Sequence, residues 1–194
     1  MSKRKSSPEQ TRTFRTGDDF ARWLEKNHSR VSGVWARFAK KGSALETMTY
    51  VEAVEVALCY GWIDALMRPE NDASWLQRFV PRRPKSLWSR INRERALGLI
   101  ERGRMRAAGF AEIERAKQDG RWDAAYDSPA TATVPAELEA ELARRPRAKR
   151  FFDGLDRVNR YAIIWRIQTA VNAETRARRL SKLVEMLESG KTLH

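Results

Sequence analysis

Cysteine and histidine are the residues that this sequence has least of. It contains one cysteine, Cys59, and two histidines, His28 and His194. A single cysteine excludes an intramolecular disulfide, which fits a reducing compartment. These residues are also too few for a Cys/His zinc site, so we expect no metal. Cys59 falls in an apolar helix stripe, where a thiol is typically structural and not paired with a histidine as a nucleophile.

Motifs that mark common catalytic and cofactor sites are also missing. The sequence has no phosphate-binding Walker A loop, no dinucleotide glycine fingerprint and no Gly-x-Ser-x-Gly elbow. No segment approaches the ~18 apolar residues of a membrane span, and the charged, polar start does not resemble a signal peptide. We therefore expect a cytoplasmic protein with no cofactor and no transmembrane segment. Whether it is an enzyme is left open.

Positive charge is what the sequence has in excess. Lys and Arg number 38 against 25 Asp and Glu, which gives a formal net charge of +13 over 194 residues. Such a charge favours polyanionic partners, although a solvated, arginine-rich surface would have the same composition. Hydrophobic residues make up 42% of the chain and seven are tryptophans, so a packed core is expected.

Hydrophobic periodicity predicts helices and strands in the first two-thirds of the chain and helices alone afterwards. Thr16 and Thr49 begin capping boxes, and Ser86 is predicted to cap a third helix. The predicted elements are helices over 16–28, 50–60, 86–102 and 109–117, a strand over 31–40, and an antiparallel hairpin of 62–67 with 74–80. We predict an α+β fold, in which a small antiparallel sheet of about three strands packs with helices and an all-helical C-terminal part follows.

Composition divides this chain into four predicted parts. They are a flexible basic tail over 1–13, an α+β core domain over 14–126, a linker over 127–135 and a helical C-terminal subdomain over 136–194. The linker is rich in Pro, Ser and Thr, which are turn-forming residues. Leu180, Leu183, Val184 and Leu187 mark the buried face of the last helix.

The stretch from Pro81 to Arg106 is the most informative, because it holds nine basic residues and two acidic ones. It joins the end of a predicted strand to the start of a predicted helix, where free backbone N–H groups and the helix dipole favour an anion. The residues predicted to bind an anion or ligand are Arg82, Arg83, Ser86, Ser89 and Arg104.

A pocket between the hairpin and the helix over 87–102 is the second candidate site. Its predicted lining is Trp62, Asp64, Arg78, Trp88, Asn92 and Arg95. Asp64 could act there as an acid or base if burial raised its pKa. In one hairpin register Asp64 lies across from Arg78, and in a neighbouring register across from Gln77. The alternative is structural: Trp88 belongs to the core, and Asn92 and Arg95 lock the helix to the sheet.

Several motifs resemble the YdeI/OmpD-associated family, also described as bacteriocin-protection proteins. They are Gly61-Trp62-Ile63-Asp64, Arg78 to Arg83, Ser86 to Asn92, Gly103-Arg104-Met105, Ala116 to Trp122 with Ala125-Tyr126, and Thr175 to Arg179. The resemblance covers about Phe14 to Leu187. It implies a role in withstanding bacteriocins or antimicrobial peptides, and no catalytic residues.

Three functions remain open on the sequence. The first is a non-enzymatic stress or antimicrobial-protection protein that binds an anionic partner through the basic strand end and helix start. The second is an enzyme or small-molecule binder with a pocket around Asp64, Trp88 and Asn92. The third is a nucleic-acid-binding protein, and a protein partner is compatible with each of them.

Overall fold

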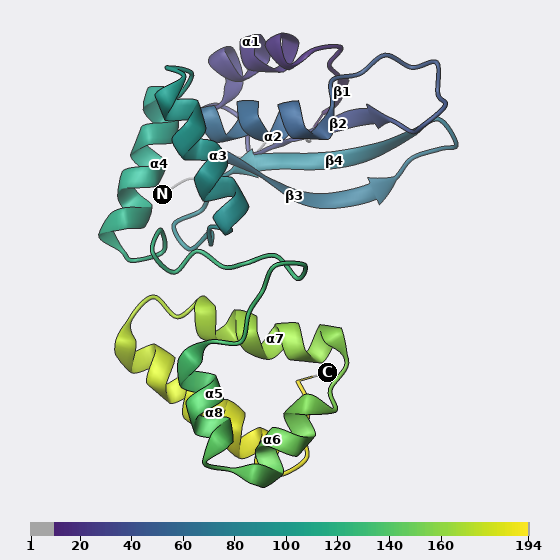
Figure 1. Ribbon diagram of the computed structural model, residues 1–194. Coiled ribbons are helices and arrows are strands. Elements are labelled where there is room, and N and C mark those ends of the chain that lie inside the picture. Colours follow the sequence, from purple (N-terminus) through teal and green to yellow (C-terminus); the bar gives the residue numbers. More distant parts are fainter. Residues whose placement is uncertain (1–9, 194) are drawn as a thin grey trace, which may run out of the picture. The chain divides into compact units, whose positions relative to one another are not determined.

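The computed structural model describes residues 10–193 of the chain (Figure 1). The described chain divides into two compact units. The first, here the sheet unit, runs through residue 86 and includes 95–115; the second, the helical unit, takes 87–94 and the chain from 116 onward. The predicted domain boundaries, with a linker over 127–135, stay a prediction.

The sheet unit contains one four-stranded sheet and two helices in its first half. These elements are β1 (Thr11–Thr13), α1 (Gly17–Asn27), β2 (Val34–Ala39), α2 (Tyr50–Cys59), β3 (Trp62–Pro69) and β4 (Ser74–Pro81). The predicted capping boxes are both present, since Thr16 and Thr49 each accept a hydrogen bond from the backbone N–H three residues on. Helix α2 ends before Gly61, whose φ of 70° suits glycine. The predicted α+β class is confirmed.

The sheet differs from the prediction in its number of strands and in their direction. Its order is β1-β2-β4-β3, and β1 pairs with β2 in parallel, so the sheet is mixed and has four strands where about three antiparallel ones were predicted. Strand β1 lies within the predicted flexible tail, whose residues 1–9 are outside the described part. Its three residues, Thr-Arg-Thr, are all exposed and carry no apolar alternation, which is why the pattern did not reveal it.

The hairpin of β3 and β4 is confirmed, but both predicted registers are wrong. Asp64 lies opposite Phe79, and not opposite Arg78 or Gln77. The register shifts between Asp64 and Met67, where β3 carries an irregularity typical of a bulge. An extra residue in one strand moves every later pair, so the alternation of apolar residues could not determine the register.

The two faces of the sheet have different surroundings. On β2, Val34, Ala36 and Phe38 are buried, while Trp35 and Arg37 between them are only partly so. The buried face packs under α1 and α2, as the ring contacts Phe20–Phe79 (5.4 Å) and Phe38–Tyr50 (6.2 Å) show (Figure 1). Along β2 the other face, here the outer face, is more exposed.

An ion pair at the outer face makes the stability of the sheet unit depend on pH. Arg37 donates to both carboxylate oxygens of Glu70 at 2.6 Å, and the Ser74 hydroxyl donates to one of them at 2.7 Å. The bonds from Arg37 first, and then from Ser74, lower the pKa of Glu70 from 4.5 to about 2.

We expect this pair to stabilise the fold fully above pH 4.5 and to lose its effect as the pH falls toward 2, because only the folded state keeps Glu70 ionised there. Glu70→Gln should flatten the pH dependence of the urea midpoint in that window and leave the slope above pH 5 unchanged. An unchanged acid slope in Glu70→Gln would contradict this assignment. Glu46→Gln is the matched control, since Glu46 is an exposed partner of Arg15.

Two further helices follow the sheet, α3 (Arg90–Glu101) and α4 (Ala107–Gln118). Helix α3 does not begin at a Ser86 cap, as predicted. The Ser86 hydroxyl instead accepts the N–H of Arg83 at 2.9 Å within the preceding turn, and Ser89 caps the helix by accepting the N–H of Asn92 at 3.2 Å. Both serines have capping chemistry, and the turn at Arg83 determines which one the helix uses.

Helix α4 begins in the sheet unit and approaches the end of α2 very closely. A Cβ atom placed on Gly109 would lie 2.5 Å from the carbonyl oxygen of Cys59 and 2.8 Å from that of Leu58. Only glycine permits this contact. It fixes the turn from Gly103 to Arg106 beside Cys59, where the N–H of Arg106 donates to the Cys59 carbonyl at 3.1 Å.

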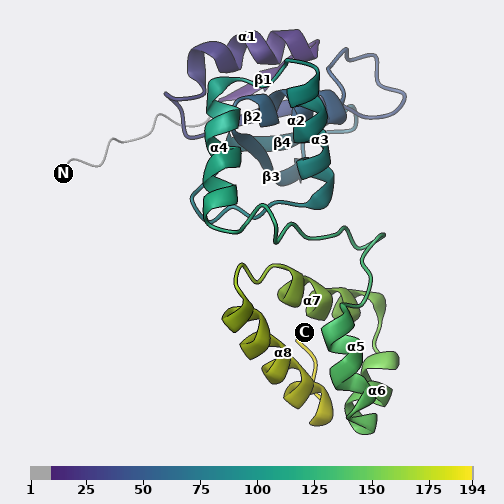
Figure 2. The ribbon, with the colours of Figure 1, turned by 60° about the vertical axis from the view of Figure 1, so that its left-hand side comes forward.

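The helical unit has its own core. Its helices are α5 (Ala136–Ala143), α6 (Pro146–Asp153), α7 (Arg157–Gln168) and α8 (Ala173–Glu188) (Figure 2). Helix α8 packs against the other three. The buried residues of this core are Leu138, Leu142, Ala148, Phe152, Ile163, Ile167, Leu183, Val184 and Leu187. The helical C-terminal part and the apolar face of the last helix are thereby confirmed.

Residues 10–193 show neither a membrane-spanning helix nor a cluster of metal-ligating side chains. None of the helices in this range is both long and apolar enough to cross a bilayer. No three His, Cys, Asp or Glu side chains in the same range gather where they could hold a metal ion.

Candidate functional site

The residues predicted to bind an anion at the strand end mostly make contacts that stabilise the fold. Arg82 is 4% exposed, its N–H donates to the Gly61 carbonyl at 3.0 Å, and its carbonyl accepts from Arg115 at 3.4 Å. Ser86 holds the backbone of Arg83, whose side chain is exposed. Arg83 is therefore the one of these three whose side chain projects into solvent. The binding role of all three stays a prediction.

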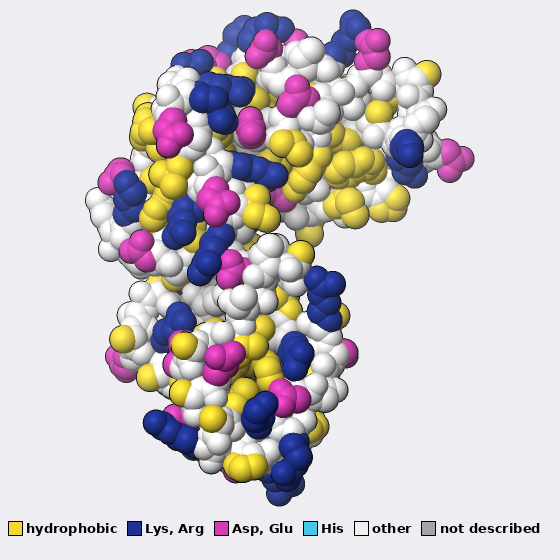
Figure 3. Space-filling view, viewed as in Figure 1, with side chains coloured by type: hydrophobic (Ala, Val, Ile, Leu, Met, Phe, Trp, Pro, Cys, Tyr) yellow, Lys and Arg dark blue, Asp and Glu magenta, His cyan; other side chains and the backbone are white. Residues whose placement is uncertain are grey.

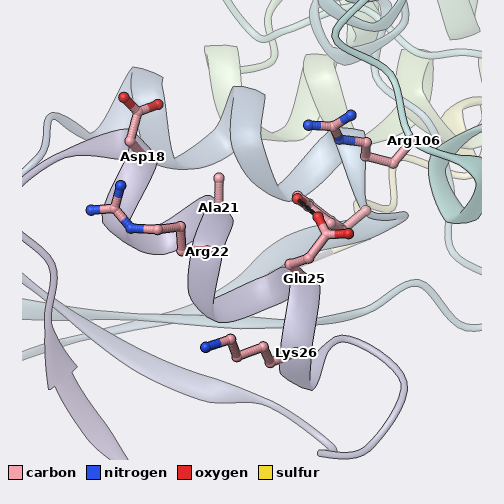
Figure 4. Close-up of a pocket in the computed structure, with 7 residues that line it drawn as sticks. Asp18, Ala21, Arg22, Glu25, Lys26 and Arg106 are labelled. Carbon is pink, nitrogen blue, oxygen red and sulfur yellow. Dashed lines mark hydrogen bonds between the residues drawn. The ribbon is translucent and has the colours of Figure 1, made fainter.

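Arg104 lies at a groove of the sheet unit, formed by α1, α2 and the turn over 103–106. Its side chain is 48% exposed and lies 3.6 Å from Glu55. Three cavities of about 340, 180 and 170 Å³ follow this groove, and Asp18 lines all of them. Figure 4 shows the largest, into which side chains of α1 and Arg106 project.

Charges of both signs line this groove. The Tyr60 hydroxyl donates to Glu25 at 2.6 Å, and burial followed by that bond raises the pKa of Tyr60. Burial likewise raises the pKa of the Cys59 thiol, so Cys59 stays protonated at neutral pH and has the surroundings of a structural cysteine. The mixture of charges is visible over the helices in Figure 3, and it favours no single class of ligand.

The predicted pocket residues divide between the two units. Trp62, Asp64, Arg78 and Arg95 belong to the sheet unit, whereas Trp88 and Asn92 belong to the helical unit. None of them lines the three cavities of the groove at Arg104.

Asp64 has a partner that the sequence did not predict. The Tyr50 hydroxyl, at the start of α2, donates to Asp64 Oδ2 at 2.7 Å. Burial first, and then this bond, raises the pKa of Tyr50. Trp62 is buried, and its indole N–H donates to the His28 carbonyl at 3.2 Å. These contacts give Trp62 a structural role, and an acid or base role for Asp64 stays a prediction.

The helical unit gathers several of the motif residues around Tyr126. Its carbonyl accepts the N–H of Arg90 at 2.8 Å, and its N–H donates to the Trp88 carbonyl at 3.0 Å. Trp88 is 1% exposed and packs edge-on against Trp122, with ring centroids 4.9 Å apart. Trp88 is thus a core residue of this unit and no stacking platform. Ser89, by capping α3, fixes the position of Arg90 as its first residue.

A polar cavity of about 260 Å³ opens beside Arg90. It is lined by Arg90, Asp123, Ala125, residues 133–137, Gln168 and Arg176. Its polar walls come from the start of α3, the segment before α5, the end of α7 and the first turn of α8. This cavity lies wholly within the helical unit.

A buried carboxylate orients Arg90 at this cavity. The side chain of Asp127 is only 8% exposed, and its Oδ1 lies 3.2 Å from Nε of Arg90. Gln168 holds the same carboxylate, since its amide donates to Oδ2 at 2.7 Å and its oxygen accepts the N–H of Asp127 at 3.1 Å. Tyr161 adds a bond from its hydroxyl to the Asp127 carbonyl at 2.8 Å. Asp127 is therefore fixed from three directions.

The second arginine of the cavity is fully engaged. Arg176 binds Glu137 through Nε at 2.6 Å and also through Nη2, and its Nη1 donates to the Ile167 carbonyl at 3.4 Å. Arg90 differs from it, because among the described residues only its Nε is bonded, while the side chain is 53% exposed. The two terminal amino groups of Arg90 remain available to a ligand.

Sequence reasoning missed Arg90, Asp127 and Gln168 as a set. Arg90 stands inside the motif over 86–92, but Asp127 lies in the predicted linker and Gln168 is 41 residues further on. Local patterns carry no information on such a pairing. A buried acid in a linker becomes visible only when the chain is folded.

Comparisons with known families match most of the chain in two parts. Residues 12–112 match the model described as a domain of unknown function (DUF8412). Residues 131–190 match the model described as "Bacteriocin-protection, YdeI or OmpD-Associated", which confirms the predicted family over a shorter range than the predicted 14–187. The motifs over 61–92 fall within the first match and Thr175 to Arg179 within the second. No curated protein and no solved structure matches the chain.

Proposed function

We propose that this chain, which belongs to the family described as a domain of unknown function (DUF8412) and carries a YdeI/OmpD-associated domain, is a non-enzymatic protein that binds an anionic partner. The observation that supports this proposal best is the geometry of Arg90. The description of the second family, bacteriocin protection, suggests that such binding serves a stress or antimicrobial-protection role.

Arg90 has the properties of a preorganised anion receptor. A guanidinium presents its donors in a rigid plane, which matches the two oxygens of a carboxylate or phosphate group. Asp127 takes the Nε donor and so holds that plane, while the terminal amino groups stay unbonded among the described residues. A ligand therefore meets a side chain that has already lost much of its rotational freedom, which reduces the entropy cost of binding.

The other charges of the cavity favour a compact ligand with a single anionic group. Glu137 and Asp127 are neutralised by arginines, so they repel an anion only weakly. Asp123 is exposed and has no bonded partner among the described residues, and it disfavours a large or multiply charged anion. The cavity volume of about 260 Å³ also limits the size of the ligand that fits.

The binding roles predicted for Arg83 and Arg104 stay separate predictions for the sheet unit and are no part of the Arg90 cavity. Arg83 is exposed, and Arg104 lies at the groove with Glu55 as its partner. Ser89 contributes indirectly, through the cap that begins α3 at Arg90.

The proposal predicts that Arg90→Ala weakens anion binding strongly. Titration calorimetry at low ionic strength, with inorganic phosphate and with acetate as separate probes, should show a loss of about tenfold or more, since a hydrogen bond to a charged group contributes roughly 1.5–3 kcal/mol. The matched control is Arg147→Ala, because Arg147 is an exposed arginine of the same unit with no bonded partner among the described residues. Its affinity should equal that of the wild type.

Two results would refute the proposal. One is an Arg90→Ala affinity equal to that of the wild type for both probes. The other is an equal loss in Arg147→Ala, which would mean that net charge alone attracts the anion. A thermal melt of each variant checks the fold, and Arg90 is exposed enough that its truncation should leave the core intact.

A further inference from the structure

The polar cavity beside Arg90 contains an acid that neither of its arginines neutralises. Arg90 pairs with Asp127, and Arg176 pairs with Glu137, so these four side chains form two neutral pairs. Asp123 also lines the cavity, is exposed, and has no hydrogen bond or ion pair among residues 10–193. The cavity therefore presents unbonded donors on Arg90 and an unneutralised carboxylate on Asp123.

Asp123 lies in a turn that is held against α3. The carbonyl of Trp122, the preceding residue, accepts a hydrogen bond from Nη1 of Arg93 at 3.2 Å. The Trp122 ring also packs against Trp88, just before α3 begins. Arg93 follows Arg90 by three positions on the helix, so the two side chains leave the same side of α3. The backbone at Asp123 and the start of α3 at Arg90 thus belong to one rigid frame.

This pair of groups selects for a ligand with charges of both signs. A simple anion at Arg90 leaves the negative charge of Asp123 uncompensated in the same cavity, and a simple cation at Asp123 leaves the donors of Arg90 unused. A carboxylate matches the planar guanidinium group, and an ammonium group offers three N–H donors to a carboxylate. The volume of about 260 Å³ lies below the usual range of pockets for drug-sized ligands, so such a ligand is compact.

We infer that this cavity binds a small amino acid in its zwitterionic form. The ligand carboxylate accepts hydrogen bonds from the terminal amino groups of Arg90, and the ligand ammonium group donates to Asp123. Arg176 and Gln168 are already bonded within the helical unit, so they form walls of the cavity and compete for neither group. The inference rests on the anion binding proposed at Arg90 and adds a second contact to it.

The test compares amino acids with the acids that lack only the amino group. Glycine, β-alanine and γ-aminobutyrate are titrated into the full chain by calorimetry at neutral pH and low ionic strength, beside acetate, propionate and butyrate. The three pairs sample the spacing between the two charged groups. We expect the amino acid with the matching spacing to bind about fivefold more tightly than its paired acid, as for a partly exposed ion pair.

Asp123→Asn should abolish this preference, because the ammonium group loses its charged partner. The affinity for the three plain acids should stay equal or rise slightly, since a repelling charge has been removed. The matched control is Glu139→Gln, because Glu139 is an exposed acid of the same unit that lies outside the cavity and has no bonded partner among the described residues. It should keep the wild-type preference. Asp123 is exposed, so its substitution should leave the thermal melt unchanged.

Three outcomes would overturn the inference. They are no amino acid binding more tightly than its paired acid, a wild-type preference retained in Asp123→Asn, and an equal loss of preference in Glu139→Gln. The proposed function is judged separately, by whether acetate binds and whether Arg90→Ala weakens that binding. Acetate binding that needs Arg90, without a preference for any amino acid, refutes the inference alone, whereas acetate binding that does not need Arg90 refutes both.

Discussion

Trp88→Ala should destabilise the helical unit by about 3–5 kcal/mol, the usual cost of truncating a buried tryptophan. Trp88 is 1% exposed and packs against Trp122, and its backbone carbonyl accepts the Tyr126 N–H. Truncation leaves a cavity between residues 87–94 and the segment around Trp122. The loss should appear as a lower urea midpoint for signals from the helical unit, such as hydrogen exchange in α7 and α8.

Trp88→Phe and Val158→Ala complete this experiment. The first keeps an aromatic ring in contact with Trp122 and should cost clearly less than Trp88→Ala. The second truncates a side chain that is 68% exposed and should stay within about 0.5 kcal/mol of the wild type. If Trp88→Ala itself stayed within that range, Trp88 would not be a core residue and a stacking role would have to be reconsidered.

Asp127→Asn should destabilise the helical unit by roughly 1.5–3 kcal/mol, the net value of hydrogen bonds to a charged group, and should also lower the affinity for anions. Arg90 and Gln168 both present N–H donors to the Asp127 carboxylate. An amide at position 127 places its own donor against one of them. The Arg90 guanidinium then loses the partner that orients it, so urea unfolding and phosphate titration should change together.

A second substitution provides the sharpest check of this network. Gln168→Glu, combined with Asp127→Asn, lets the new amide donate to the new carboxylate and still offers an oxygen to Arg90. The double variant should recover much of the lost stability. Asp123→Asn is the matched control, since Asp123 is an exposed acid of the same cavity. Equal stability loss in Asp123→Asn, or no recovery in the double variant, would argue against the proposed arrangement.

The position of a motif residue in this protein depends on contacts with residues that are distant in the sequence. Ser89 caps α3 locally, yet the direction of Arg90 depends on Asp127 and on Gln168 beyond it. The sheet shows the same dependence, because Arg68 reaches Trp35 only through the pairing of β3 with β4 and of β4 with β2. In both cases the orientation of the arginine depends on several residues together.

The sequence by itself determined the helix starts at Thr16 and Thr49, the hairpin and the apolar face of α8. These features depend on residues within a few positions of one another, so capping chemistry and periodicity report them directly. It also indicated the stretch around Ser89 as important.

Only the tertiary structure decided the parallel strand β1, the register of Asp64, the choice of Ser89 over Ser86 as cap and the pairing of Arg90 with Asp127. A three-residue exposed strand has no pattern of its own, and a bulge shifts the register without changing the composition. The partner of a buried carboxylate is set by which segments meet on folding, and residues 127 and 168 meet across 41 positions. Local signals extend over a few residues, whereas the contacts that orient Arg90 extend over the whole helical unit.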